Sequence, residues 1–263
     1  MSAPRIDVRV DARGAARVTL ENAARLNCMS AALAREIAAA MQAIGRDPRA
    51  RVAVLTGAGD KALVGGADLD ELGALDETSA RVFITALHEA CAAVRECPVP
   101  VVARVNGWCI GAGLELAAAC DVRIAAASAQ FSMPEVRLGI PSVIEAALLP
   151  RLIGAGRARW LTLTGEAIDA ATAERWGFLE RVVPAAGLDA AVEAAVEAIL
   201  ANDDAATRVQ KRLQAEYEDR PMAESIPRSI DAFAACYASG RPQRLLGELS
   251  ARRRSARANR RKD

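Results

Sequence analysis

The sequence predicts an α/β fold with a helical C-terminal region. Segments with the two-residue alternation of strands and segments with helical spacing follow one another up to about residue 184. Strands that alternate with helices are typical of α/β domains. Beyond residue 184 the pattern is helical, and 52% of the 263 residues are hydrophobic, which is enough to build a large core. We therefore expect an α/β core over residues 1–185, and a helical region over 186–263.

The expected elements follow one another in a regular order. Two antiparallel strands are expected at 6–10 and 16–22, because apolar and polar residues alternate there. A helix is expected over 30–44, with Ser30 as its N-cap. The remaining elements are expected as strands at 51–57, 99–107 and 121–127, a helix at 77–97, loops that lead into helices at 57–73 and 106–121, helices around a glycine-rich joint at 142–166, and a helix with a short strand at 172–184.

Composition and charge exclude several classes of protein. The formal net charge is +1, so no general attraction to nucleic acid or to a membrane surface is implied. The first ten residues lack an apolar signal core, and no uncharged apolar run approaches the ~18 residues that a membrane span needs. None of the six cysteines forms a C-x-x-C pair, which favours reduced thiols over disulfides or structural zinc. We therefore expect a cytoplasmic protein without a membrane partner.

The chain contains a single histidine, His88. A Ser-His-Asp or Cys-His triad, or a histidine-rich metal site, would have to use it. His88 lies within residues 81–94, which have the pattern of an amphipathic helix, so we expect a structural or surface role for it. If the protein is an enzyme, carboxylates and backbone dipoles are the expected catalysts, and no metal is expected.

Two glycine-rich loops stand before expected helices. The run GAGDKA at 57–62 fits the dinucleotide fingerprint G-x-G-x-x-A, but residues 61–66 continue as loop instead of opening a long helix. The glycines at 65–66 and at 107–113 each precede a helix more directly. Two such loops could aim two N–H groups at one oxygen atom, as in an oxyanion hole. The alternative is that each loop is only a tight turn.

Glu115 stands within an apolar helical run at 111–119. A charge buried there is costly unless it is paired or used for chemistry, although a helix dipole can stabilise a carboxylate in the first turn without any catalytic role. Glu135 follows in a loop, where a solvated carboxylate is the alternative to a catalytic one. Two carboxyl groups on opposite sides of one water could serve as acid and base.

Four motifs, in order, resemble those of the crotonase superfamily, which contains the enoyl-CoA hydratases and isomerases. They are GGADLDEL at 65–72, NGWCIGAGLELAAACD at 106–121, AQFSMPEVRLGI at 129–140 and LTGEAIDAATAERWGFLERVVP at 163–184. The resemblance covers at least residues 17–184. It implies a crotonase-type spiral of ββα units, followed by a C-terminal helical region that forms oligomers.

The resemblance also implies roles for individual residues. The oxyanion donors would be the N–H groups of Gly65 and Ala112, which hold the carbonyl oxygen of an acyl-CoA thioester. Glu115 and Glu135 match the two catalytic glutamates of the hydratases. A mobile cation at Lys61 or Arg25 could pair with a CoA phosphate, or lie on the surface. The residues that match CoA-binding positions are Ala24, Leu63, Ala67, Asp68 and Leu69.

One departure from the family pattern bears on the acyl group. Typical hydratases carry P-G-x-G-G after the third motif, whereas this chain has IPSVIEAALLPRL at 140–152. Ser142 stands where glycine is usual, and Ile144 and Glu145 replace the small pair. Glu145 is either part of a reshaped acyl pocket or a surface charge on a helix.

These observations predict an enoyl-CoA hydratase of fatty acid metabolism, which reversibly adds water in syn fashion to a 2-enoyl-CoA thioester. The alternatives are another crotonase reaction, such as double-bond isomerisation, or a non-catalytic CoA-ester- or RNA-binding protein. CoA is part of the substrate, so no separate cofactor is expected. Further copies of the chain are expected as partners, in a homotrimer or a dimer of trimers, whereas nucleic acid is not. The basic stretch 252–262 is a solvated helix end, a CoA phosphate site or an RNA site.

Overall fold

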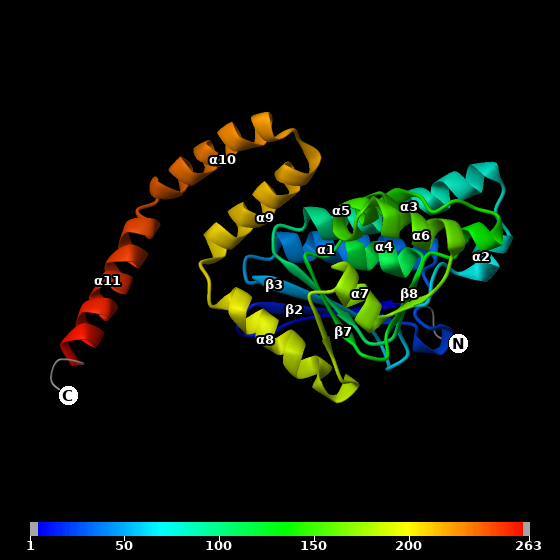
Figure 1. Cartoon of the computed structure of the whole chain (residues 1–263), viewed down its shortest axis with the longest axis horizontal. Coiled ribbons are helices and arrows are strands. Elements are labelled where there is room, and N and C mark those ends of the chain that lie inside the picture. Colours follow the sequence, from blue (N-terminus) through cyan, green and yellow to red (C-terminus); the bar gives the residue numbers. More distant parts are fainter. Residues whose placement is uncertain (1–4, 260–263) are drawn as a thin grey trace. The chain divides into compact units, whose positions relative to one another are not determined.

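The computed structural model of the protein describes residues 5–259, with side chains to residue 254 (Figure 1). The chain forms two compact units, residues 1–207 and 208–263. The first unit contains all the strands of the described residues and the helices between them. Within the described residues, no helix is both long enough and apolar enough to cross a membrane.

The larger sheet begins with an antiparallel pair and continues with parallel neighbours, as the sequence predicts for an α/β core. Its central strands are β3, β5 and β7, and they are apolar along most of their length. Over the described residues it contains six strands in the order β1 (Arg5–Val10), β2 (Ala15–Glu21), β3 (Val52–Gly57), β5 (Val101–Val105), β7 (Val122–Ala126) and β10 (Arg181–Val183).

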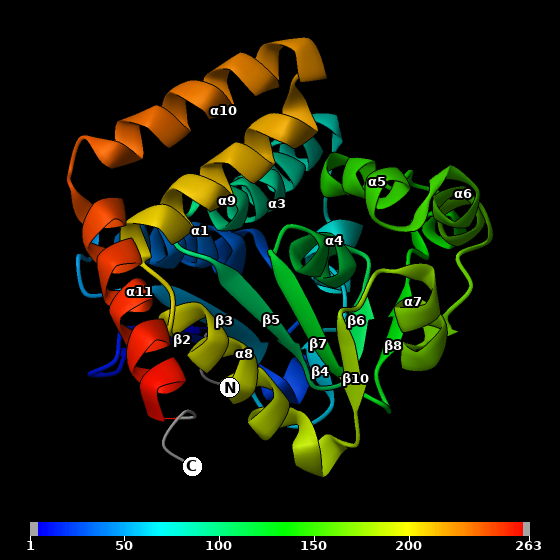
Figure 2. The ribbon, with the colours of Figure 1, turned by 60° about the vertical axis from the view of Figure 1, so that its left-hand side comes forward.

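Both faces of this sheet are buried. In β3, Val52 and Val54 face one hydrophobic cluster and Ala53 and Leu55 face the other, because successive side chains of a strand point to opposite sides. Helix α8 (Leu188–Leu200) covers the face of Val52 and Val54 (Figure 2). The face of Ala53 and Leu55 is covered by α1 (Ala31–Arg46), α3 (Glu77–Glu96) and α4 (Ala112–Ala118). Continuous apolar strands are expected when both faces are covered.

The helices begin where their capping residues predict. Ser30 accepts a hydrogen bond from the Leu33 N–H at 3.1 Å, so it is the N-cap of α1, as expected. Asp76 and Ser79 form a reciprocal capping box at the start of α3. The other helical segments of the first unit are η1 (Ala23–Arg25), α2 (Leu69–Gly73), η2 (Glu135–Leu138), η3 (Ile144–Leu148), α5 (Leu149–Ile153), α6 (Ala155–Thr164), α7 (Ala170–Trp176) and η4 (Ala185–Gly187).

A second, smaller sheet was not expected from the sequence. Its strands are two or three residues long, and all four fall in segments predicted as loops or left unassigned. Such short strands carry too few residues for an alternating pattern to be visible. Among the described residues the order is β4 (Ala62–Val64), β6 (Trp108–Ile110), β8 (Gln130–Ser132) and β9 (Ile168–Asp169), with β4, β6 and β8 parallel.

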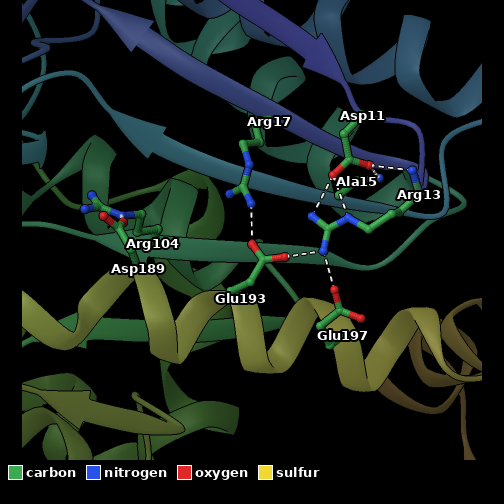
Figure 3. Close-up of polar contacts among 8 residues, drawn as sticks. All are labelled: Asp11, Arg13, Ala15, Arg17, Arg104, Asp189, Glu193 and Glu197. Carbon is green, nitrogen blue, oxygen red and sulfur yellow. Dashed lines mark hydrogen bonds and ion pairs between the residues drawn. The ribbon is translucent and has the colours of Figure 1, made fainter.

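Helix α8 extends the first unit beyond residue 185, where the sequence suggested a soft boundary. Its buried face includes Leu188, Val192 and Val196, which pack on the strands of the larger sheet. Charged side chains border this contact: Glu193 pairs with Arg13 and Arg17 from the β1–β2 hairpin (Figure 3). Residues after 185 therefore complete the core of the first unit.

The second unit consists of helices in the part of the chain that the structure describes. They are α9 (Asp204–Asp219), which begins in the last residues of the first unit, α10 (Met222–Tyr237) and α11 (Arg241–Asn259). Within this unit Arg228 of α10 pairs with Glu216 of α9 at 2.7 Å. The basic stretch 252–262 runs past the described residues, so its expected roles stay predictions.

Candidate active site

The smaller sheet brings three chain segments to one edge. Strand β4 leads into the Gly65–Ala67 loop, β6 leads into α4, and β8 leads into η2. Because the three strands are parallel neighbours, their carboxyl ends meet at the same edge, where ligands bind in many α/β proteins. The Gly111 N–H also donates to the Ser132 carbonyl at 2.9 Å, which ties the start of α4 to the end of β8.

Gly111 lets the two glutamates approach each other. Its φ is +50°, a conformation that favours glycine, and a Cβ at this position would collide with Oε1 of Glu135. Gly111 is the residue before α4, and Glu115 lies one turn further along that helix, where its N–H donates to the Gly111 carbonyl. The structure therefore brings Glu115 and Glu135, both predicted from the sequence, to the same place.

Glu115 is buried, with only 4% of its surface exposed. Its Oε1 accepts a hydrogen bond from the Ala146 N–H at 3.1 Å. Burial raises the pKa of Glu115 to about 8, and the nearby carboxyl group of Glu135 adds to this rise, while the Ala146 bond opposes it. A carboxyl group with such a pKa holds its proton near neutral pH.

Glu135 has a different environment. It begins η2 and is only half-buried, and its Oε2 accepts a hydrogen bond from the Ser142 hydroxyl at 2.8 Å. Two carboxyl groups in unlike surroundings can carry one proton between them, so that one is available as an acid and the other as a base. Ser142 and Ala146 were not predicted as site residues, because each reaches its glutamate through a contact that only the folded chain creates.

The predicted oxyanion donor Gly65 is wrong. Its N–H donates to the Leu26 carbonyl at 2.8 Å, so it is not free to bind a substrate oxygen. Glycine is needed here for another reason, since a Cβ would lie 2.8 Å from the Cβ of Leu26. Ala67 pairs with Met29 in a parallel bridge, in which Met29 donates to the Gly66 carbonyl and accepts from the Asp68 N–H, on either side of Ala67. The Ala67 N–H is thus left without a partner among the described residues.

Ala112 fits the predicted role of a donor. It is the first residue of α4, where an N–H has no partner within the helix, and the helix dipole favours negative charge at this end. The Ala67 loop lies against the same region: a Cβ on Gly66 would lie 3.8 Å from the Ile110 carbonyl oxygen, one residue before Gly111. Two N–H groups from neighbouring loops thus flank the edge that holds the glutamates.

The other predicted CoA-binding residues lie on both sides of the loop after β4. Ala24 and Leu69 are exposed, so both can touch a ligand at the surface. The Leu63 side chain is fully buried, which leaves only its backbone for binding. Asp68 caps α2, accepting from the Asp70 N–H at 3.1 Å. These positions stay a prediction.

The two predicted phosphate-binding cations differ. Arg25 contacts Asp68 at 3.2 Å and Asp70 at 2.5 Å, so carboxylates already occupy its guanidinium. The Lys61 side chain is exposed and makes no ion pair with any described residue. Of the two, Lys61 is therefore free to meet a phosphate.

Glu145 is not the surface charge that one interpretation of the sequence suggested. Only 4% of it is exposed, and its Oε1 lies 3.0 Å from Nδ1 of His88. His88 is partly exposed on α3, in agreement with its predicted structural or surface role. Over the described residues, no group of three or more His, Cys, Asp or Glu side chains is placed to hold a metal ion.

A buried carboxyl group, a second one beside it and nearby N–H groups without a partner among the described residues form an arrangement that can transfer protons next to a polarised carbonyl group. The sequence profile described as enoyl-CoA hydratase/isomerase matches residues 11–242. This chain belongs to the enoyl-CoA hydratase/isomerase family.

Similar proteins include hydratases from several bacteria. Crotonyl-CoA hydratase of Syntrophomonas wolfei is 35% identical over 215 residues, which cover 81% of this chain and 83% of that protein. Short-chain-enoyl-CoA hydratase of Clostridium acetobutylicum is 30% identical, covering 84% of this chain and 85% of its own. The crystal structure of an enoyl-CoA hydratase from Bacillus anthracis superposes with a TM-score of 0.84 at 33% identity, covering 88% of this chain and 90% of that one.

Proposed function

We propose that this protein is an enoyl-CoA hydratase, a hydro-lyase that adds water to a 2-enoyl-CoA thioester. The observation that carries this proposal is the approach of Glu135 to the start of α4, the helix on which Glu115 stands. An isolated structural carboxylate does not need a second one beside it, and like charges at close range are costly. Paired carboxyl groups are the arrangement that acid–base addition of water requires.

In the proposed mechanism, a water molecule lies between the two carboxyl groups and the double bond. One carboxylate removes a proton from the water as its oxygen bonds to C3, and the other carboxyl group gives a proton to C2. Both new bonds form on the face where the glutamates lie, which makes the addition syn. Dehydration follows the same steps in reverse.

The thioester oxygen gains negative charge as the water oxygen attacks. We assign its two hydrogen-bond donors to the N–H groups of Ala112 and Ala67, because neither donates to another of the residues that the structure describes. One such donor typically contributes about 3 kcal/mol to the stability of the transition state. The Ala67 N–H replaces that of Gly65 in this role.

CoA enters this reaction as part of the substrate, and the proposed chemistry uses no further cofactor. Backbone and side-chain groups from Ala24 to Leu69 supply the CoA site, and Lys61 is the cation proposed to meet a phosphate. The named substrates of two relatives, crotonyl-CoA and short-chain enoyl-CoA, lead us to propose a short acyl group and a place in fatty acid metabolism.

We further propose that the protein is cytoplasmic and assembles as a homotrimer or as a dimer of trimers through its C-terminal helices. An exposed apolar stripe runs along α10 at spacings of three and four residues, which places its members on one face. A contiguous exposed face of this kind marks an interaction surface in many proteins. Its members are Met222, Ile226, Ile230, Phe233 and Tyr237.

The test is the loss of ultraviolet absorbance when the conjugated thioester of crotonyl-CoA takes up water. Purified protein should consume crotonyl-CoA and form 3-hydroxybutyryl-CoA, identified by mass. Formation of a shifted double bond without a gain of water would instead indicate isomerisation. Tight binding of the thioester without turnover would contradict any catalytic role.

A further inference from the structure

One short segment, residues 142–146, contacts both proposed catalytic carboxyl groups. The Ser142 hydroxyl donates to Glu135 at 2.8 Å, and the Ala146 N–H donates to Glu115 at 3.1 Å. The position of this segment therefore decides how both glutamates are oriented. Contacts that hold this segment in place therefore also affect the orientation of Glu115 and Glu135.

Glu145 ties the segment to helix α3. Its Oε1 lies 3.0 Å from Nδ1 of His88, and η3 packs against both α3 and α4. The other carboxyl oxygen, Oε2, is buried and has no hydrogen-bond partner among the described residues. A buried carboxyl oxygen without a partner is costly, and the cost is larger when the side chain is charged than when it is neutral.

The backbone between these contacts is strained. Ile144 has φ of +41°, in the left-handed region that β-branched residues rarely adopt. Such a conformation persists only when surrounding contacts hold it. The Glu145–His88 contact comes directly after the strained residue, and the Ala146 N–H directly follows Glu145.

Titratable groups face Glu145 from two helices. From α3 it faces His88, Cys91 and Arg95, and from α4 it faces Glu115. Burial raises the pKa of Glu145, and the three α3 groups oppose that rise in part. The Glu145 carboxylate in turn adds to the raised pKa of Glu115, after the effects of burial and of Glu135.

We propose that the His88–Glu145 pair is a positioning device for Glu115: it fixes the Ala146 N–H against the Glu115 carboxyl group and places a second negative charge beside it. Neither residue touches the substrate. The kinetic part of this proposal rests on the proposed hydratase function, because it concerns how the acid–base pair is set.

The pair itself can be tested without any substrate. His88 is the only histidine, so selective ¹⁵N labelling of histidine gives signals from one imidazole ring. Its Nδ1 signal should change in Glu145→Gln, because the charged acceptor is lost. It should not change in the control Glu89→Gln, which alters an exposed residue next to His88 on the same helix. An unchanged Nδ1 signal in Glu145→Gln would overturn the proposed pair.

Kinetics with crotonyl-CoA then separate two effects of the pair: the orientation of the Glu115 carboxyl group and the charge of Glu145. Glu145→Gln keeps an oxygen for His88 but removes the charge, so the pH limb that reports Glu115 should move to lower pH. His88→Ala removes the contact with Glu145. We expect kcat to fall about tenfold or more with little change in KM, because a displaced Glu115 carboxyl group loses its near-attack geometry. His88→Asn, whose amide nitrogen can take the place of Nδ1, should restore most of the loss.

Two results would overturn the kinetic part: a wild-type pH profile in Glu145→Gln, or a wild-type kcat in His88→Ala. His88 is about half exposed, so its replacement leaves folding intact, and thermal unfolding of each variant checks this. A wild-type protein that fails to hydrate enoyl-CoA thioesters would instead contradict the proposed function, and the imidazole measurement would still decide whether the pair exists.

Discussion

At the scale of single residues, the proposed site depends on two carboxyl groups in unlike surroundings. Replacing Glu115 or Glu135 by Gln keeps the shape and removes the acid–base function. Each variant should lower kcat by at least ~10²-fold and leave binding of CoA thioesters nearly unchanged. Steady-state kinetics with crotonyl-CoA and calorimetric binding of butyryl-CoA measure the two effects. Near wild-type turnover in either variant would contradict the paired-carboxyl mechanism.

Glu115 also makes stability depend on pH. Its pKa is about 8 in the folded protein, against an ordinary value of 4.5. Between these values the unfolded chain has released a proton that the folded chain keeps, so stability falls as pH rises through this window. The loss is on the order of 5 kcal/mol. Glu115→Gln should remove it, as urea unfolding at both ends of the window would show; an unaltered pH dependence would contradict the buried, protonated state.

Gly111 has no room for a side chain, because the carboxyl group of Glu135 occupies that space. Gly111→Ala introduces a Cβ that collides with Oε1 of Glu135, at a positive φ that residues with a side chain rarely adopt. We expect kcat to fall ~10²-fold, because the Glu135 carboxyl group must move. The matched control is Gly73→Ala in α2, where a Cβ meets no atom within 4 Å. Equal activity in both variants would show that Glu135 does not depend on this approach.

The glutamates could be predicted from the sequence because each lies in a recognisable local motif. The partners that orient them could not. Gly65 was predicted as a donor from its place in a motif, but Leu26, which occupies its N–H, lies on a different loop. His88 and Glu145 are 57 residues apart, so no local pattern connects them.

At the scale of secondary structure, capped helices and long apolar strands were predictable and the smaller sheet was not. The N-cap Ser30 and the alternation in β1 and β2 are local signals that the structure confirms. Strands of two or three residues depend on neighbours from distant parts of the chain. The site is built on these short strands, which is why its oxyanion donors were harder to predict than its glutamates.

Substitutions in α8 can show whether apolar packing or ion pairs hold this helix to the larger sheet. Leu188 is 1% exposed, so Leu188→Ala should destabilise the protein by about 2–5 kcal/mol through lost burial and a residual cavity. Glu193→Gln breaks the ion pairs with Arg13 and Arg17 (Figure 3), and it should cost a small fraction of that, because exposed ion pairs contribute little. Chemical unfolding measures both, and a larger loss for Glu193→Gln would reverse this ranking.

At the scale of the whole molecule, the boundary between the two compact units depends on where helix α8 packs. Both α8 and α9 have helical spacing, and periodicity alone does not say which surface a helix covers. The sequence therefore indicated an α/β part and a helical part correctly, while the first compact unit includes a helix assigned to the second part.

The proposed assembly gives a whole-molecule prediction. Phe233→Glu places a charge in the apolar stripe of α10, where Phe233 is 66% exposed. If the stripe is buried between copies, the variant should form smaller species than the wild type, because an unpaired buried charge is strongly unfavourable. Light scattering after gel filtration measures the mass. Ala235→Glu, an exposed position on the opposite side of α10, is the control.

Two outcomes of that experiment would contradict the assembly. A monomeric wild-type protein would contradict it directly. A Phe233→Glu variant that keeps the wild-type mass would exclude the stripe as the contact between copies. Unchanged helical circular dichroism in both variants would confirm that α10 still folds.

The position of α8 in the chain has a consequence for synthesis on the ribosome. The last strand, β10, ends at Val183, and the helix that closes one face of the larger sheet runs from Leu188 to Leu200. Until those residues emerge, the sheet exposes an apolar face that includes Val52, Val54 and Val102. At about 5–20 residues per second this interval lasts on the order of a second. Nascent chains stalled before residue 188 should therefore bind a chaperone that chains stalled well beyond residue 200 release.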